Sequence, residues 1–586
     1  MQVYKAPTAD MRFIYETLGY DKISGMKPFE DFDLDTTMAI LEETGKFCTK
    51  EMLPLNRSAD QEGVSYDPET HNVKTPEGFK ALYKKYVDSG MGAIAMPTEY
   101  GGGGAPHSLA VAIGEFACAT NKSFSMCPGL GHGLVEALMH FGTDEQKAYY
   151  LPKIISGEWT GTMCLTEPQC GTDLGLMGTK AIPDGDGYLI TGTKIWITFG
   201  EHDLADNIIH LVLARLPDAP EGIKGISLFV VPKVLDSGER NPVFCGGLEH
   251  KMGIHASPTC VINLEGARGF LVGEPHKGMK GMFVMMNHAR LGVGLEGIAL
   301  SEIAYQTSVA YARDRRQGRS LNKERNDESS SADNILVHPD VRRQLLNVRA
   351  STEGMRALAL WTAMNIDIAH AHEDEDERRK AKGIVELMTP IVKAYCTERG
   401  FSNVSEAMQV TGGSGYTTDW CIEQYLRDAR IAMIYEGTNH IQALDLIGRK
   451  LPKGGGALYR AFSKEVYKFT VANQDVYGMG EFASALGSAI NTLNETTMNL
   501  GMKGMADPEA AAAVASNYLN MFGIVAVAYM WGRMAEKALA EESRFNMTKL
   551  KMARYYYNQI LPEIDSIKKI IEAGKDHMMA FEPAEF

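Results

Sequence analysis

The sequence predicts an α+β fold that is mostly helical, with a small β-barrel or β-sandwich between helical regions. Apolar residues follow helical spacing before residue 160, short β-branched runs separated by turns follow, and helical spacing then returns. A chain of 586 residues is long enough for several domains. We expect an N-terminal helical domain over 1–160, a β domain over 161–278, a helical bundle over 279–451 and an additional helical domain over 452–586.

The first helical region is indicated by residues 33–52 and 108–119, which mix apolar and charged positions at helical spacing. An Asp-Gly-Asp-Gly turn at 184–187 marks the β region. Runs rich in β-branched and aromatic residues predict strands over 188–190, 194–198, 208–213, 226–231 and 260–264.

Helical spacing returns near residue 281, and Leu291, Leu295 and Ile298 should share one helix face. Two polar stretches, 322–334 and 373–382, predict exposed loops within this region. A Pro-Lys-Gly-Gly-Gly linker then precedes a last helical segment, which we expect to extend to about residue 573.

Composition excludes several classes of function. The net charge of −15 argues against general nucleic-acid binding, which needs a basic surface. The nine cysteines are scattered and form no CxxC pair, so neither a disulfide framework nor a zinc site is expected. The most apolar stretch, 510–531, is broken by Asn517 and Asn520 and falls short of a membrane span. With no signal peptide apparent, we expect a cytoplasmic protein.

Two segments of the middle region could present polar groups to a flat ring. The first reads LTEPQCGTD and places hydroxyls at Thr166 and Thr172 around a proline and a glycine. The second reads GTKIWIT, and strand alternation places Lys194, Trp196 and Thr198 on one face. Each segment alone also fits an ordinary turn or a core tryptophan.

Two later segments also contain chemically useful residues. The first, QVTGGSGY, begins at Gln409, and its glycines would let a backbone approach a phosphate. It does not have the GxGxxG pattern of a Rossmann nicotinamide site. The second, IYEGTNHIQ, places Glu436 beside a glycine, with Thr438 able to cap the helix that follows. Alone, these segments fit a helix-ending loop and a surface glutamate equally well.

Together and in this order, the four segments resemble motifs of the acyl-CoA dehydrogenases. LTEPQCGTD is similar to the flavin loop of that family, GTKIWIT to its flavin-facing strand, QVTGGSGY to its pyrophosphate loop and RDARIAMIYEGTNHIQ to its base-bearing segment. The resemblance covers about residues 30–450. The length, the YKAP start and the long tail resemble the larger branch that includes the 3-methylthiopropionyl-CoA (3-methylmercaptopropionyl-CoA) dehydrogenases.

The resemblance implies an FAD cofactor, no metal, and Glu436 as the catalytic base. The cofactor-binding residues that it implies are Thr166, Gly171, Thr172, Trp196, Thr198, Arg315, Gln317, Gln409, Gly412, Gly413, Thr438 and His440. The substrate contacts that it implies are Met126, Cys127, Gly129, Tyr435 and Gly437.

Arg315 and Gln317 resemble the pair that reaches the FAD of a neighbouring subunit in this family, which implies a homo-oligomer, at least a dimer. The implied electron acceptor is electron-transfer flavoprotein. Two departures from the family pattern matter. Gly318-Arg319 stands where Phe-Gly is usual and the insertion 322–334 follows directly, which weakens the match at the adenosine end. In the β domain, His255 stands where an arginine is common, and we expect it to be structural rather than catalytic.

The implied reaction removes hydrogens from the α and β carbons of a CoA thioester. The α-proton is weakly acidic, so the charge that develops on the carbonyl oxygen must be stabilised. The family uses the backbone N–H of the catalytic glutamate and a ribityl hydroxyl. Glu436 would take the α-proton while a hydride leaves the β-carbon for the flavin. Some members place the base on another helix, but the matching residue here is Ala289, which cannot act as a base.

The narrower resemblance implies conversion of 3-methylthiopropionyl-CoA to 3-methylthioacryloyl-CoA, a step of dimethylsulfoniopropionate catabolism. A short- or medium-chain fatty acyl-CoA dehydrogenase and an acyl-CoA oxidase stay open as alternatives. Soft side chains near Met126 suit a thioether and an alkyl tail equally well. A non-catalytic flavin-binding assembly protein is the remaining alternative, against which the presence of Glu436 argues.

Overall fold

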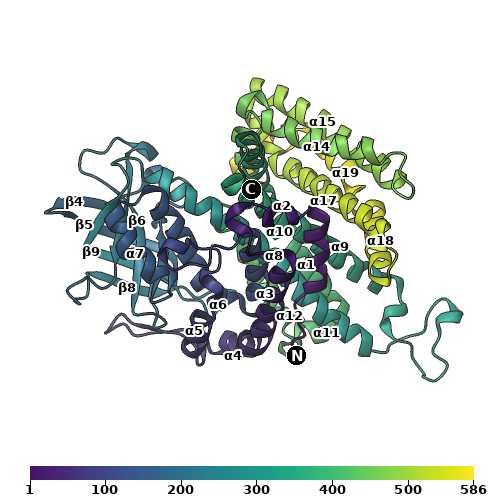
Figure 1. Cartoon of the computed structure of the whole chain (residues 1–586), viewed down its shortest axis with the longest axis horizontal. Coiled ribbons are helices and arrows are strands. Elements are labelled where there is room, and N and C mark those ends of the chain that lie inside the picture. The colour runs from purple at the N-terminus through teal and green to yellow at the C-terminus, as the bar shows by residue number, and fades with distance from the viewer. The chain divides into compact units, whose positions relative to one another are not determined.

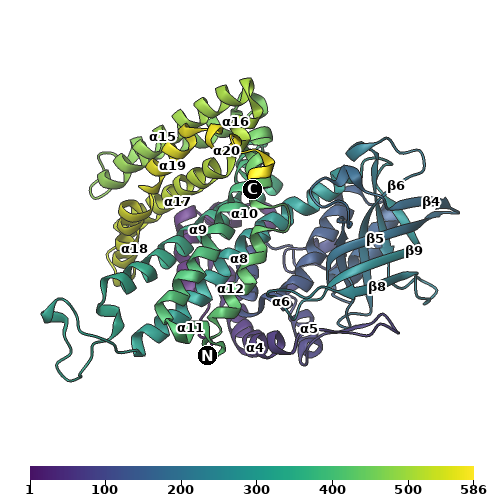
Figure 2. The ribbon, with the colours of Figure 1, turned by 180° about the vertical axis from the view of Figure 1, so that it is seen from behind.

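A computed structural model describes the backbone of all 586 residues and the side chains of all but Val284, Asn287 and His288. The chain divides into two compact units. Unit 1 comprises Met1–Glu42, Pro106–Glu115 and Arg290–Phe586, and unit 2 comprises Glu43–Ala105 and Phe116–Ala289. The ribbon is shown from opposite sides in Figures 1 and 2.

Unit 2 is built on a seven-stranded sheet in the order β3-β6-β4-β5-β9-β7, with β8 paired to β9. An additional pairing between β6 and β7 closes the central strands into a barrel, as predicted. The strands are β3 (Trp159–Cys164), β4 (Lys180–Asp184), β5 (Gly187–Thr198), β6 (Asn207–Arg215), β7 (Ile226–Pro232), β8 (Val243–Leu248) and β9 (Thr259–Val272). A small hairpin comprises β1 (Ser65–Tyr66) and β2 (Val73–Lys74).

All five runs predicted as strands lie in strands, and 188–190 and 194–198 belong to the single strand β5. The helices of unit 2 are α4 (Leu53–Glu62), α5 (Phe79–Asp88) and α7 (Asp144–Ile155). A buried apolar cluster joins α7 to the sheet through residues such as Leu151, Leu211 and Val230. A second cluster that includes Ile190, Phe229 and Ile262 fills the barrel.

Unit 1 is helical, as Figure 1 shows. Its helices are α1 (Thr8–Leu18), α2 (Asp21–Ser24), α9 (Pro339–Ala371), α10 (Glu375–Thr411), α11 (Gly413–Tyr416), α12 (Ile422–Arg430), α13 (Asn439–Asp445), α14 (Ala457–Asn473), α15 (Gly480–Ala506), α16 (Pro508–Ala513), α17 (Ala515–Ala540), α18 (Arg544–Tyr555), α19 (Glu563–Ala573) and α20 (Asp576–Met579). Both units share α3 (Leu34–Phe47), α6 (His107–Phe141) and α8 (Gly278–Asp314). Leu291, Leu295 and Ile298 are all buried on α8, which confirms the predicted helix face.

The prediction of an exposed loop over 373–382 is wrong, because α10 begins there at Glu375. The carboxylate of Asp374 caps the helix by accepting the backbone N–H of Asp376 at 2.7 Å. Acidic residues at an N-cap and in a first turn are themselves a signal for a helix start. The other polar stretch, 322–334, is mostly irregular and contains one 3₁₀ turn at Lys323–Arg325.

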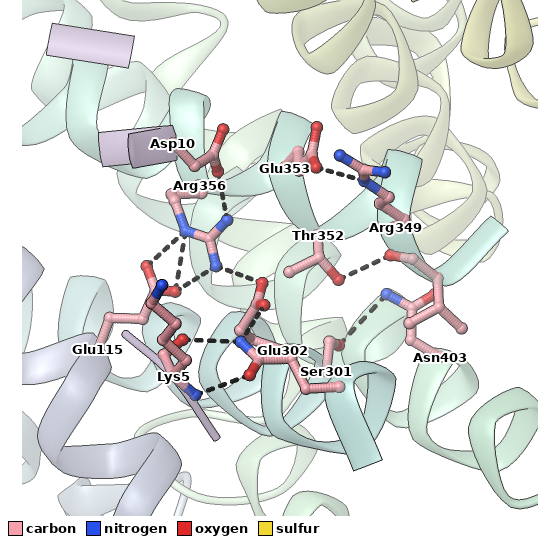
Figure 3. Close-up of polar contacts among 12 residues, drawn as sticks. Lys5, Asp10, Glu115, Ser301, Glu302, Arg349, Thr352, Glu353, Arg356 and Asn403 are labelled. Carbon is pink, nitrogen blue, oxygen red and sulfur yellow. Dashed lines mark hydrogen bonds and ion pairs between the residues drawn. The ribbon is translucent and has the colours of Figure 1, made fainter. Parts of the chain in front are cut away.

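A buried ionic cluster joins several helices of unit 1 (Figure 3). The guanidinium of Arg356, on α9, is 1% exposed. It donates to Glu115 of α6 at 2.6 and 2.9 Å, to Asp10 of α1 at 2.5 Å and to Glu302 of α8 at 2.7 Å. Because buried charges are costly unless they are paired, this arrangement fixes α1 against the central helices.

The same cluster includes the C-terminal helical region. Lys549 of α18 donates to Asp10 and, at 2.8 Å, to Glu353 of α9. Trp531 of α17 donates its indole N–H to the carbonyl of Ala350 at 3.0 Å. The tail therefore packs on the helices of unit 1 through buried polar contacts as well as apolar ones. Within the part of the chain that the structure describes, no helix has both the length and the apolar run that crossing a bilayer requires.

Candidate active site

Glu436 lies in a tight loop between a 3₁₀ turn, Ile431–Met433, and α13. Its φ is +55°, and the next residue, Gly437, has a φ of +82°. A Cβ added to Gly437 would lie 2.6 Å from Nε2 of Gln442, so only glycine fits this position without movement of its neighbour. Thr438 ends the loop, and its hydroxyl accepts the backbone N–H of Ile441 at 3.3 Å, which confirms its predicted capping role.

The electrostatic surroundings of Glu436 suit a base. Burial raises the pKa of this carboxyl above its ordinary value, and the Glu296 charge also raises it. The positive charges of Arg290 and Lys393 oppose this rise. A carboxylate whose proton affinity is raised is better matched to proton abstraction near neutral pH.

Arg290 lies beside the loop that contains Glu436. It directly follows Ala289, the residue at the position where some family members have their base. The Arg290 side chain is 6% exposed, and its Nη1 is 3.7 Å from the carboxylate of Asp445. Its Nε–H has no hydrogen-bond partner among the described side chains and backbone groups. A buried donor of this kind next to Glu436 is available to an oxygen of a bound ligand.

Tyr435 and His440, the predicted site residues on either side of Glu436, lie in different surroundings: one is anchored to α8 and the other is exposed near α17. The hydroxyl of Tyr435 donates to Glu296 of α8, so this side chain is anchored within unit 1. His440 is exposed, and its Nδ1 lies 3.0 Å from the hydroxyl of Ser516 on α17. The His440 ring therefore contacts the C-terminal helical region in this structure.

Arg315 and Gln317 lie with exposed side chains directly after α8. The insertion 322–334 folds back onto this segment: the backbone N–H of Gln317 donates to the carbonyl of Asp333 at 2.9 Å. Asp333 is fully buried, and its carboxylate accepts from Arg319 at 3.1 Å and from the backbone of Ser320 at 2.7 Å. The insertion thus orders the arginine motif and leaves both predicted cofactor side chains at the surface.

The glycine loop at the end of α10 has an open backbone. Gln409 is exposed, and Gly412 has a φ of +57°. A Cβ added to Gly412 or Gly413 would meet no atom within 4 Å. The positive φ of Gly412 itself favours glycine. At Gly413, packing inside the chain does not explain the absence of a side chain, whereas close approach of a phosphate would.

In unit 2, the loop that contains Thr166 and Thr172 is organised by Glu167. The buried Glu167 carboxylate accepts the Nζ of Lys194 at 2.8 Å, the backbone of Gly178 at 2.7 Å and the hydroxyl of Thr179 at 2.5 Å. Burial opposes its ionisation, but the Lys194 charge and these donors lower the pKa of Glu167 to about 2. Thr166 is half-buried and Thr172 is exposed, as is Gly171 beside it.

The prediction that Lys194, Trp196 and Thr198 share one face of the strand is wrong for Lys194. A bulge in β5 lies between Lys194 and Ile197, whose partners on β9 are Ile262 and Cys260. One extra residue reverses the side-chain alternation, so Lys194 and Ile197 are buried while Trp196 is 56% exposed.

The loop that contains Thr166 and the bulged strand β5 lie together in unit 2. The backbone N–H of Ile195 donates to the carbonyl of Thr166 at 2.9 Å. Trp196, at the bulge, has a φ of +63°, and Thr198 follows it on the same face with a half-buried side chain. The exposed indole of Trp196 and the hydroxyl of Thr198 therefore lie on strand β5, and a backbone hydrogen bond attaches the loop that contains Thr166 to the same strand.

Three of the predicted substrate contacts, Met126, Cys127 and Gly129, lie on α6. Cys127 is buried and borders a cavity of about 40 Å³, together with Tyr83, Tyr86 and Met96. Met126 is half-buried and Gly129 is exposed, and neither borders this cavity.

Sequence reasoning missed two residues that shape these parts of the site. Glu167 lies inside the LTEPQCGTD motif, between the candidate ligand-binding residues Thr166 and Thr172. That position is the only signal in the sequence that could have indicated its role. Lys393 lies 2.8 Å from the carbonyl of Gly437 but is far from it along the chain. No local pattern in the sequence indicates that contact.

Comparison with known proteins supports the family resemblance over the whole chain. The acyl-CoA dehydrogenase N-terminal, middle and C-terminal domain models match residues 35–158, 162–267 and 276–451, and an acetyl-CoA dehydrogenase C-terminal-like model matches 462–582. A 3-methylmercaptopropionyl-CoA dehydrogenase of Ruegeria pomeroyi is 41% identical over 96% of each chain. A broad-specificity linear acyl-CoA dehydrogenase of Mycobacterium tuberculosis is 33% identical over 100% of each chain.

A solved structure shares the fold. The acyl-CoA dehydrogenase of Bacillus anthracis complexed with FAD superposes with a TM-score of 0.76 at 23% identity, covering 94% of this chain and 90% of that one. The domain matches and the two relatives establish that the chain belongs to the acyl-CoA dehydrogenase family. It is an FAD-dependent oxidoreductase, and the open glycine loop and the exposed indole of Trp196 are compatible with that cofactor.

Proposed function

We propose that this chain oxidises 3-methylthiopropionyl-CoA to 3-methylthioacryloyl-CoA, with Glu436 as the base. The observation that carries the proposal is the Glu436 loop, in which burial raises the pKa of a carboxyl held at a positive φ beside two cations. The similarity to a relative named 3-methylmercaptopropionyl-CoA dehydrogenase supports the choice of acyl group.

In the proposed reaction, Glu436 accepts the α-proton as the α C–H bond breaks. The β C–H bond breaks with its electron pair, and a double bond forms between the two carbons. The two-electron acceptor for that hydride would be supplied by bound FAD. The backbone N–H of Glu436 would donate to the thioester oxygen, and the charge of Arg290 would favour the developing negative charge nearby.

The cofactor would be held by groups from the recognised motifs. Thr166, Thr172 and Trp196 would meet the flavin ring, and the backbone at Gly412 and Gly413 would approach the pyrophosphate.

A fatty acyl-CoA dehydrogenase is the second candidate, favoured by the similarity to a broad-specificity linear acyl-CoA dehydrogenase. Anaerobic mixing of the FAD-loaded protein with 3-methylthiopropionyl-CoA or with butyryl-CoA separates the two. We expect the flavin absorbance to bleach with both substrates and clearly faster with the thioether. Faster bleaching by butyryl-CoA would assign the protein to the fatty acyl-CoA enzymes.

We further propose electron-transfer flavoprotein as the electron acceptor and a homodimer as the working form. The exposure of Arg315 and Gln317 supports this proposal because it leaves both side chains free to reach a cofactor bound by another subunit, and an arginine fork matches pyrophosphate oxygens. Sedimentation of the FAD-loaded protein should give twice the mass of the 64.3 kDa chain. Turnover should be fast with electron-transfer flavoprotein and slow with oxygen; rapid oxygen consumption would identify an oxidase instead.

A further inference from the structure

The loop that bears Glu436 is held by a buried lysine of the neighbouring helix. Lys393 of α10 is fully buried, and its Nζ donates to the carbonyl of Gly437 at 2.8 Å and to Oδ1 of Asn439 at 3.0 Å. Both acceptors lie within three residues of Glu436. A lysine buried in this way has exchanged its hydration for these contacts.

Neighbouring groups complete the attachment on both sides of the loop. Thr397, one turn after Lys393 on α10, donates its hydroxyl to the carbonyl of Lys393 at 2.8 Å, and the same Oγ1 lies 3.2 Å from Oδ1 of Asn439. The amide of Asn439 donates back to the carbonyl of Ala394 at 3.2 Å. From the other side, Gln442 donates to the carbonyl of Gly437, also at 3.2 Å. The Gly437 carbonyl therefore accepts from two side chains at once.

These contacts stabilise an unusual backbone conformation of the Glu436 loop. A non-glycine residue in the left-handed region is strained and persists only where its surroundings fix it. Glu436 has such a conformation, with a φ of +55°, and Gly437 follows with +82°. Fixing the Gly437 carbonyl fixes the peptide plane that follows Gly437. Gln442 also donates to the carbonyl of Glu436 at 3.2 Å, in the peptide plane that follows Glu436. Together these contacts restrain the backbone from which the carboxylate projects.

We propose that Lys393 is a positioning residue for the reaction: it holds the base loop in its left-handed conformation and places a positive charge beside Glu436. The proposal rests on the proposed function, in which Glu436 is the base. Lys393 itself would contact neither the substrate nor the cofactor.

The charges around Lys393 define its second effect. Glu296 and Arg290 face it from α8, Glu436 from the loop and Glu398 from α10. Burial is the main cause that lowers the pKa of Lys393, to about 8, and the three carboxylates oppose that fall. While it is charged, Lys393 lowers the pKa of Glu436. Loss of this charge should therefore raise the pKa of Glu436 further.

The variant Lys393→Met tests both effects in the FAD-loaded protein. At saturating substrate we expect anaerobic flavin reduction about 10- to 100-fold slower than in the wild type, because a small misplacement of a reacting group has costs of that order. The KM should change little. The acid limb of the pH–rate profile should move to higher pH. The matched control is Lys380→Met, an exposed lysine of the same helix, which should leave rate and profile unchanged.

Amide hydrogen exchange over residues 434–440 gives a readout that does not depend on turnover. Exchange should be faster in Lys393→Met than in the wild type, and Lys393→Arg, which keeps a charged donor, should restore part of the protection and of the rate. If Lys393→Met does not fold, Asn439→Ala removes the side chain that Lys393 and Thr397 hold, and faster exchange with slower flavin reduction is expected there.

Lys393→Met could show the same amide exchange, rate of flavin reduction and acid limb of the pH–rate profile as the wild type while Glu436→Gln is inactive. That result would overturn the positioning role of Lys393 and leave the proposed function standing. If none of the acyl-CoA substrates reduces the flavin of the wild-type protein, the proposed function is wrong. In that case the exchange measurement alone decides whether Lys393 holds the loop: faster exchange supports it, and unchanged exchange refutes it.

Discussion

Replacing Glu436 with glutamine should slow flavin reduction by acyl-CoA about 10²- to 10⁴-fold, or more, because the variant has no general base for the α-proton. Glutamine keeps nearly the same shape, so the loop and the contacts of Gln442 with its backbone should persist. Anaerobic stopped-flow absorbance of the bound flavin measures the effect directly. The matched control is Glu375→Gln, an exposed glutamate in the first turn of α10, which should reduce flavin at the wild-type rate.

The wild-type rate should also depend on pH in a defined direction. Only the carboxylate form of Glu436 can accept a proton, and burial raises the pKa at which that form appears. Flavin reduction should therefore accelerate as the pH rises through the raised pKa of Glu436. A rate independent of pH on the acid side, or a Glu436→Gln variant as fast as the wild type, would contradict the assignment of the base.

Replacing Arg356 with methionine should have the largest effect on stability. The variant leaves the carboxylates of Asp10, Glu115 and Glu302 in a buried cluster without their shared guanidinium. Removing one partner of a buried ion pair typically costs about 3–5 kcal/mol, since a charge is left uncompensated. Thermal denaturation followed by circular dichroism should show a clearly lower transition temperature.

An exposed arginine on the same unit provides the comparison. Arg379 of α10 is 71% exposed and pairs with Asp376 at the surface, so Arg379→Met should change the stability by no more than about 0.5 kcal/mol. Adding Glu115→Gln to Arg356→Met should recover part of the loss because one buried charge is removed. Equal stability of Arg356→Met and Arg379→Met would show that the cluster does not contribute as described.

The arrangement of helices and strands could be predicted because it depends on periodicity within short windows. The face defined by Leu291, Leu295 and Ile298 is buried, and every predicted strand run lies in a strand. The start of α10 was missed because its acidic first turn resembles a solvated loop in composition. The cap at Asp374, rather than the charge of the stretch, is the informative feature there.

The site was harder to predict because its geometry depends on contacts that are distant in the chain. The motif around Glu436 predicts a catalytic base there, but nothing near Lys393 indicates that its ammonium holds the Gly437 carbonyl. Alternation along the GTKIWIT segment failed at Lys194 because a bulge inserts one residue, and bulges leave no clear pattern in a single sequence. Local patterns therefore indicate the chemistry of these residues, while their positions depend on pairing partners elsewhere.

The rate of anaerobic flavin reduction with 3-methylthiopropionyl-CoA deuterated at the α-carbon tests most directly whether this protein abstracts an α-proton with Glu436. We expect the wild type to bleach its flavin more slowly with the deuterated than with the ordinary substrate, and Glu436→Gln to bleach it barely at all with either. Equal rates for the two substrates, together with unimpaired bleaching in Glu436→Gln, would contradict α-proton abstraction by this residue.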